Sequence, residues 1–108
     1  MKVIFVSGKY RADTEYKLLA NIEHARTEAH MLWCSGWAVF CPHMNTAFMG
    51  DGDDLKYLDG DLEILRRCDA IYMLKGADCS LGAIEELKLA KELGLEIIQE
   101  GDYHAPSN

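Results

Sequence analysis

Four short runs of apolar residues have the length and composition of buried β-strands. They cover residues 3–6, 37–41, 70–74 and 95–98. Short apolar runs rich in β-branched and aromatic side chains are typical of a parallel sheet that is covered on both faces. The first run ends at Ser7 and Gly8 and the second ends at Pro42, and these residue types commonly close a strand and open a turn.

Between these runs, apolar residues recur at the three- and four-residue steps of an amphipathic helix. The first helical segment follows Asp13 and Thr14, which can cap a helix, and it ends at Gly36. Two more helices are predicted over residues 55–67 and 81–93. Residues 42–54 show no helical period and are predicted to form an irregular loop, and a turn is predicted over residues 76–80.

Strands that alternate with helices predict an α/β fold of the flavodoxin-like or Rossmann-like type. Such a fold is a three-layer sandwich, here with a parallel sheet of four, or at most five, strands. We expect a single domain over residues 1–100 and a polar C-terminal tail over residues 101–108. Ligands bind such sheets at the carboxyl ends of the strands, so we expect the site in segments 7–13, 42–53 and 75–80.

The composition excludes several classes of protein. The chain has 108 residues, of which 49% are hydrophobic and 27% are charged, as in an ordinary globular domain. No apolar run approaches the roughly 18 residues of a membrane span. The N-terminal apolar stretch is too short for a secretory signal, so we expect a cytoplasmic protein.

The charge balance is acidic, with a formal net charge of −7. Binding of duplex nucleic acid is not expected, because it needs a basic surface and the longest basic cluster here is the pair Arg66–Arg67. A small anionic ligand remains compatible with the sequence, because a few local donors can outweigh the global charge.

The cysteines are expected to be reduced thiols in a cytoplasmic protein. They are Cys34, Cys41, Cys68 and Cys79. Cys41 and His43 form the one close pair of potential ligands, and no second pair faces them at the spacing of a zinc finger. We therefore expect no metal and no other cofactor.

The residues that follow the first strand are candidates for binding an anion. Gly8 lets the backbone approach a ligand, and Lys9 and Arg11 bring positive charge into an acidic protein. The segment has neither the three glycines of a dinucleotide fingerprint nor a Walker loop. A plain turn with solvated cations explains the same pattern, so both interpretations stay open.

Two adjacent glutamates in the last predicted helix differ in their orientation. The apolar side of this helix is centred near Ala83, Leu87 and Ala90. Glu86 falls at the edge of that side, whereas Glu85 points nearly opposite and is expected to be a surface charge. A carboxylate at the rim of a buried face can be desolvated and rigid, as a nucleophile or general base requires. For Glu86, a catalytic role and a simple helix-edge charge are both open.

Other candidate site residues follow from their places in the predicted fold. Ser80 can cap the last helix, and the free N–H groups at Ser80 to Gly82 can then bind an anion. Asp61 is the candidate for a second active carboxyl group, with a surface charge in mid-helix as its alternative. His43 and Asn45 follow the second strand and could contact a base or a sugar, or simply belong to the loop.

Three segments resemble a known family when they are taken in order. They are residues 3–11 (VIFVSGKYR), residues 61–71 (DLEILRRCDAI), and Ser80-Leu81-Gly82 leading to Glu86-Leu87 and Ala90. Together they span nearly the whole chain, and their order and spacing resemble the nucleoside 2-deoxyribosyltransferase-like superfamily. The resemblance includes its small nucleoside-monophosphate N-glycosidase branch and many short phage and bacterial members.

The resemblance implies an N-glycosidic bond hydrolase or transferase that acts on (deoxy)nucleoside 5′-monophosphates or nucleosides. Glu86 would attack the anomeric carbon of the sugar, and the base would leave with a proton. Water or a second base would then resolve the glycosyl-enzyme ester, as in retaining glycosidases. Asp61 would orient the sugar or assist the departing base.

The resemblance also implies how the substrate is held. Ser80 lies six residues before Glu86, where classical transferases tend to carry an acid and monophosphate hydrolases a serine that helps to hold phosphate. The expected substrate-binding residues are Ser7, Gly8, Tyr10, Arg11, His43, Asn45, Ser80 and Gly82. Family sites are often completed by a neighbouring subunit, so we expect a homodimer or a higher homo-oligomer.

One residue departs from the family pattern and keeps an alternative open. Many members carry a tyrosine in the first strand whose hydroxyl supports the nucleophile, and this chain has Phe5 there, with Tyr10 nearby. The loss of that donor would lower the activity or indicate a non-catalytic nucleotide-binding module, such as a sensor or sponge. A phospho-receiver domain fits less well, because the third strand ends in Leu74 and Lys75 without the aspartate that a receiver needs. A flavin-binding domain of the same topology is a further alternative, and an absence of yellow colour would exclude it.

Overall fold

Four parallel strands form the centre of the structure, a computed structural model that describes residues 1–49, 54–103, 105 and 106. The strands are β1 (Val3–Ser7), β2 (Ala38–Phe40), β3 (Ala70–Met73) and β4 (Glu96–Gln99), in the spatial order β2-β1-β3-β4. The helices are α1 (Glu15–Cys34), α2 (Pro42–Asn45), α3 (Asp54–Leu65), the 3-10 helix η1 (Ala77–Cys79) and α4 (Leu81–Leu93).

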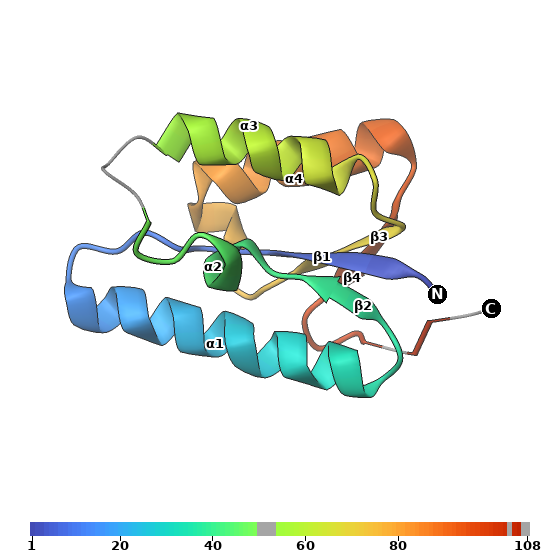
Figure 1. Cartoon of the computed structure of the whole chain (residues 1–108), viewed down its shortest axis with the longest axis horizontal. Coiled ribbons are helices and arrows are strands. Elements are labelled where there is room, and N and C mark those ends of the chain that lie inside the picture. The colour runs from blue at the N-terminus through green and yellow to red at the C-terminus, as the bar shows by residue number, and fades with distance from the viewer. Residues whose placement is uncertain (50–53, 104, 107–108) are drawn as a thin grey trace.

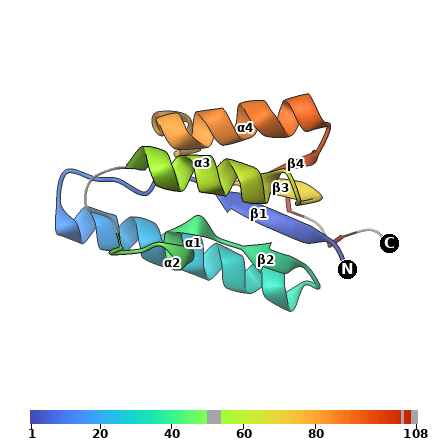
Figure 2. The same cartoon turned by 45° about the horizontal axis from the view of Figure 1, so that its top comes forward.

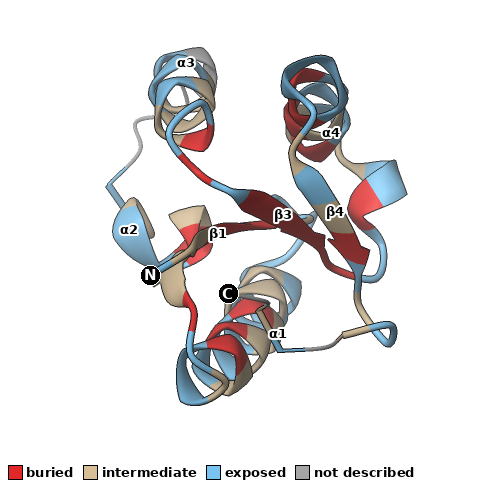
Figure 3. Ribbon diagram, turned by 90° about the vertical axis from the view of Figure 1, so that its right-hand side faces the viewer, coloured by how far each residue is buried: buried red, intermediate tan, exposed pale blue. Residues whose placement is uncertain are grey.

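The helices cover both faces of the sheet. Helix α1 lies on one face, and α3 and α4 lie side by side on the other (Figure 1, Figure 2). The view along the layers shows the sheet between them, with the buried residues turned toward it (Figure 3). The predicted α/β sandwich with an all-parallel sheet is therefore confirmed. From β1 the chain first moves to β2 on one side and later returns to β3 on the other, so the strand order reverses between β1 and β3.

Alternation along β1 divides its side chains between two apolar cores. Ile4 and Val6 belong to the core under α1, together with Leu32, Trp37, Tyr72 and Ile98. Phe5 belongs to the core under α3 and α4, together with Leu65, Ile71, Met73, Ala83 and Ala90. Ser7 follows Phe5 at the next position of the same strand face, so its side chain lies on the side of α3 and α4.

The structure differs from the prediction between β2 and α3. Residues 42–45 were predicted as irregular, which is wrong, because they form the short helix α2. Pro42 occupies its first turn, where a fixed φ favours helix initiation, and the N–H groups of Met44 and Asn45 both donate to the carbonyl of Cys41. Four residues are too few to show a helical period in the sequence. Residues 50–53 of the predicted loop lie outside the described residues.

The segment that follows β4 continues along the α1 side of the sheet. Tyr103 packs against the core under α1, and its ring meets that of Tyr72 edge to face at 6.4 Å between centroids. Residues 101–108 were expected to form a polar tail, and within them Tyr103 is half-buried. No helix in the described ranges combines the length and the apolar character that crossing a bilayer requires.

Gly8 shows how tightly the chain crosses the end of the sheet after β1. A Cβ atom at Gly8 would lie 2.6 Å from Cδ1 and 2.8 Å from Cβ of Leu74. Because Leu74 is buried and directly follows β3, it has little room to move. We expect Gly8→Ala to lower the free energy of unfolding by about 1–3 kcal/mol, as other overpacked cores do, measured by urea denaturation.

Gly60 in α3 provides the matched control for this substitution. Nothing lies within 4 Å of a Cβ atom built there. Gly60→Ala should therefore raise the free energy of unfolding by about 0.5–1 kcal/mol, because alanine favours the helix more than glycine does. A loss of stability at both positions would contradict a steric role for Gly8.

Candidate active site

A buried carboxylate and a buried hydroxyl meet where the strand order reverses. The Ser7 hydroxyl donates a hydrogen bond of 2.6 Å to Oε1 of Glu86, across a sequence separation of 79 residues. Ser7 ends β1 and is 1% exposed, and Glu86 lies in α4 and is 7% exposed. Parallel α/β sheets bind their ligands at this kind of position.

The packing of α4 explains why Glu86 faces inward. Ala83, Glu86 and Ala90 are buried on one side of this helix. The two alanines present little bulk toward the sheet, so the longer Glu86 side chain can reach the end of β1. Glu85 is exposed, as the helical pattern of the sequence predicts.

Burial dominates the electrostatics of this carboxyl group. Removal from water raises the pKa of Glu86 from 4.5 to about 7. The hydrogen bond from Ser7 acts in the opposite direction because it stabilises the ionised form, and the negative charge of Asp61 adds to the rise. The proton of Glu86 is therefore exchanged close to neutral pH.

Asp61 supplies a second carboxyl group from the neighbouring helix α3. It is half-buried, and this burial raises its pKa from 3.8 to about 6. Two carboxyl groups that titrate near neutral pH and influence each other can divide the roles of nucleophile, acid and base between them. Both carboxyl candidates named from the sequence thus lie in one electrostatically coupled site.

A second group of candidates surrounds the loop between β1 and α1. Nε2 of the buried His43 lies 2.9 Å from the carbonyl oxygen of Lys9. A carbonyl only accepts, so Nε2 carries the proton, and burial lowers the pKa of His43 and keeps the ring neutral. The ring also meets that of Tyr10 edge to face, at 5.8 Å. His43 therefore holds this loop in place.

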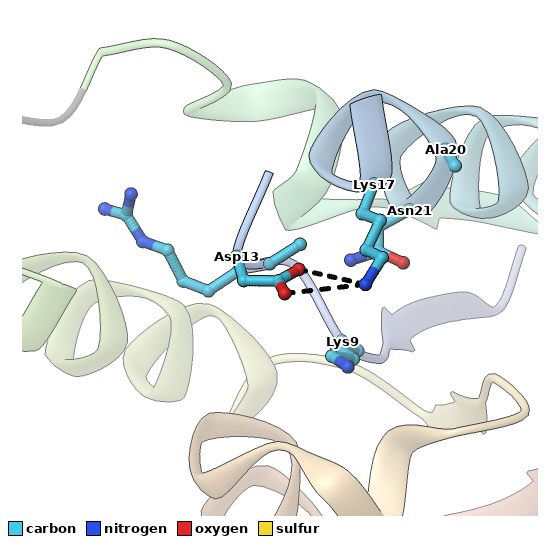
Figure 4. A pocket seen from close by; sticks show the side chains of 7 residues that line it. Lys9, Asp13, Lys17, Ala20 and Asn21 are labelled. Atoms are coloured by element: carbon cyan, nitrogen blue, oxygen red, sulfur yellow. Dashed lines mark hydrogen bonds and ion pairs between the residues drawn. The ribbon is translucent and has the colours of Figure 1, made fainter. Parts of the chain in front are cut away.

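The same loop contributes to a basic hollow on the surface (Figure 4). The hollow has a volume of about 580 Å³ and is lined by Lys9, Arg11, Ala12, Asp13, Lys17, Ala20 and Asn21. Asp13 pairs with Nζ of Lys17 at 3.2 Å at the start of α1. The Arg11 guanidinium lies 5.7 Å from the centre of the Tyr10 ring. Three basic side chains and one acidic side chain line this hollow, so its charge suits an anion. Glu86 is not among the lining residues.

The remaining candidates lie at helix ends. The Ser80 hydroxyl accepts a hydrogen bond of 3.3 Å from the N–H of Ala83 and caps α4. A Cβ atom at Gly82 would be 3.9 Å from its nearest neighbours, so packing does not require glycine there. Asn45 is exposed at the end of α2. The structure thus brings Ser7, Asp61 and Glu86 together and leaves the exposed Asn45 at a helix end.

The partner of Glu86 was missed by sequence reasoning. Phe5 lies at the position of the family tyrosine, but its ring is fully buried and packs 5.5 Å from that of Phe40. The hydroxyl comes instead from Ser7, which was expected to bind substrate. Strand alternation places residues 5 and 7 on the same face, and this signal could have identified Ser7 as the replacement donor.

The described residues contain no group of three or more histidine, cysteine or acidic side chains arranged to hold a metal ion. The four cysteines are free, with Cys41 and Cys68 buried and Cys34 and Cys79 exposed.

The fold is similar to that of 2-deoxyribosyltransferases, as the resemblance implied. Residues 2–99 match the family described as "Domain of unknown function (DUF4406)", and the chain belongs to this family. A search of curated proteins gives no significant match.

Two solved structures show the similarity of the fold. A 2-deoxyribosyltransferase from the psychrotolerant bacterium Bacillus psychrosaccharolyticus has a TM-score of 0.65 and 19% identity, with 90% of this chain and 70% of that chain covered. A 2-deoxyribosyltransferase from Leishmania mexicana has a TM-score of 0.63 and 20% identity, with 92% and 63% covered. The chain therefore spans about two thirds of the length of these enzymes and shares their fold.

Proposed function

We propose that this protein cleaves or exchanges the N-glycosidic bond of a (deoxy)nucleoside 5′-monophosphate or nucleoside. The observation that carries the proposal is the buried Glu86 carboxyl group, held by the Ser7 hydroxyl at 2.6 Å where the strand order reverses. A buried carboxylate fixed in one orientation has the properties of a nucleophile. The similarity of the fold to two deoxyribosyltransferases supports the same chemistry.

Glu86 acts as the nucleophile in a double displacement. One carboxylate oxygen forms a bond to the anomeric carbon while the bond from that carbon to the base nitrogen breaks. The electron pair of the broken bond leaves with the base, which takes up a proton. Water or a second base then attacks the same carbon and releases the carboxylate, so the configuration of the sugar is retained. The hydrogen bond from Ser7 keeps Glu86 oriented through both steps.

Asp61 assists the departing base or orients the sugar. Its pKa of about 6 allows it to hold a proton under mildly acidic conditions and to release it near neutral pH. The negative charge of Asp61 raises the pKa of Glu86. Ionisation of Glu86 is therefore favoured when Asp61 is neutralised, either by a proton or by a cationic partner.

The basic hollow supports a 5′-monophosphate as the preferred ligand. Lys9, Arg11 and Lys17 concentrate positive charge beside the end of β1 in a protein of net charge −7. The N-terminus of α4, capped by Ser80, adds a second group of N–H donors. We further expect a homodimer or larger homo-oligomer, as the family resemblance implies.

A base-release assay tests this proposal. The protein is incubated with a panel of ribo- and deoxyribonucleoside 5′-monophosphates and the matching nucleosides, with and without an added second base. We expect chromatography to detect free base from at least one monophosphate, released faster than from its nucleoside. No release from any member by folded protein would reject the proposal. Thermal stabilisation by a nucleotide without release would support the non-catalytic binding module instead.

A further inference from the structure

The segment between α2 and α3 carries an unusual exposed aromatic residue. Phe48 has a φ of 62°, and it is the only residue other than glycine with a positive φ in the described ranges. Its side chain is 64% exposed, as is that of Met49 beside it. Bulky residues rarely adopt this backbone conformation, and when they do they are concentrated at functional sites.

Two tyrosine hydroxyls hold this segment at neighbouring positions. The N–H of Phe48 donates to the Tyr10 hydroxyl at 3.3 Å, and the Tyr57 hydroxyl donates to the carbonyl of Met49 at 3.0 Å. Tyr10 belongs to the loop after β1, and Tyr57 belongs to α3. The strained conformation is therefore supported by contacts from two separate elements.

Both supporting tyrosines come from elements that carry the carboxylate site. Tyr57 lies one helical turn before Asp61, so the two share a face of α3 and are separated by about 6 Å along its axis. Tyr10 follows Ser7 by three residues, which is at most about 11 Å of chain. Phe48 is thus held between the two elements that bring Ser7 and Asp61 to Glu86.

The chemistry around Phe48 indicates the kind of ligand that would cover it. An exposed aromatic ring is removed from water most effectively by a flat apolar surface that packs against it. The Tyr10 ring that supports its backbone also lies under the Arg11 guanidinium, at the basic hollow. A ligand that combines a planar ring with an anionic group matches both features.

We propose that Phe48 is a base-stacking residue, whose ring packs against the nucleobase of the substrate and favours nucleotides over sugar phosphates. This inference rests on the proposed function, because it assigns a contact within the same site. It adds a specificity-determining residue in segment 42–53, where the sequence singled out His43 and Asn45 but not Phe48.

Two variants of Phe48 test the inference. Phe48→Gly removes the ring, and glycine adopts a positive φ without strain, so the backbone is preserved. We expect it to raise KM for nucleoside monophosphates about tenfold with little change in kcat, because stacking of one base on an aromatic ring has an effect of this size. Phe48→Tyr keeps an aromatic ring and should therefore keep KM close to the wild-type value. Trp33→Ala, which removes an exposed aromatic residue of α1, should leave KM unchanged.

Direct binding separates this inference from the proposed function. Calorimetry on the Glu86→Gln background, with and without Phe48→Gly, compares a nucleoside monophosphate with ribose 5-phosphate. The loss of the ring should weaken binding of the nucleotide about tenfold and leave binding of the sugar phosphate unchanged. This comparison decides the role of Phe48 even if the wild-type protein releases no base, an outcome that rejects only the proposed function.

Several results would overturn the inference. Equal weakening of both ligands would mean that Phe48 only supports the loop. Unchanged binding of the nucleotide, or no binding of any nucleotide by protein that carries Phe48, would mean that the base does not contact the ring. A change of molar mass in light scattering for Phe48→Gly, with unchanged binding of the nucleotide, would place the ring in an interface between copies of this chain.

Discussion

Replacement of Glu86 by glutamine should reduce the release of free base by about a thousandfold or more, as removal of a nucleophile does in other enzymes. Glutamine keeps the size of the side chain and an oxygen that can accept the hydrogen bond from Ser7. It lacks the negative charge that the attack on the anomeric carbon requires. The rate of release is measured by chromatography at saturating nucleotide, at a pH above 7 where Glu86 is ionised.

Glu85 is the matched control for this substitution. It is the preceding residue of the same helix, but it is exposed. Glu85→Gln should leave the rate within about twofold of the wild-type value, since exposed substitutions away from a site have small effects. Circular dichroism confirms that both variants are folded. If both variants lost activity to the same extent, Glu86 would not be the nucleophile.

The same Glu86→Gln variant should unfold less readily than the wild-type protein at pH 8. The pKa of Glu86 rises from 4.5 to about 7 on burial, so ionisation of this group opposes folding. At about 1.4 kcal/mol per pH unit, the full effect is about 3 kcal/mol. Below pH 4.5 the carboxyl group is protonated in both states and the effect is absent; it grows as the pH rises and is complete above pH 7. Glutamine does not ionise, so the variant escapes this loss of stability.

Urea unfolding at pH 4 and pH 8 measures this difference. The gain in the free energy of unfolding should be about 3 kcal/mol at pH 8 and close to zero at pH 4. Glu85→Gln serves again as the control, because it makes the same chemical change at an exposed position of the same helix. If the free energy of unfolding rose equally at both pH values, the packing of the glutamine side chain rather than its lack of charge would explain the gain. If it did not rise at pH 8, the buried carboxylate would not be destabilising.

Together the two expected results describe a residue that is retained at the expense of stability. The hydrogen bond from Ser7 only partly compensates the buried Glu86 carboxylate for its lost hydration, because burial still raises its pKa. Functional sites commonly contain such groups, and their replacement commonly stabilises a protein while removing its activity. Gain of stability and loss of activity in one variant would support the assignment of Glu86 more strongly than either result alone.

The sequence by itself determined the layer architecture and the orientation of the main carboxylate. The four apolar runs and the helical periods between them predict an alternating α/β chain, and alternation predicts a parallel sheet covered on both faces. The pattern of Ala83, Leu87 and Ala90 correctly separates the buried Glu86 from the exposed Glu85. These features depend on which face of each element is apolar, and that information is local.

Only the tertiary structure decided which side chains meet. The hydrogen bond between Ser7 and Glu86 joins residues 79 apart, and it exists because the strand order β2-β1-β3-β4 and the packing of α4 bring those elements together. The contact of Gly8 with Leu74 and the left-handed backbone of Phe48 have the same origin. The raised pKa of Glu86 likewise follows from its burial in the assembled fold. Periodicity reports which residues face inward, whereas their partners, strain and ionisation depend on the elements packed against them.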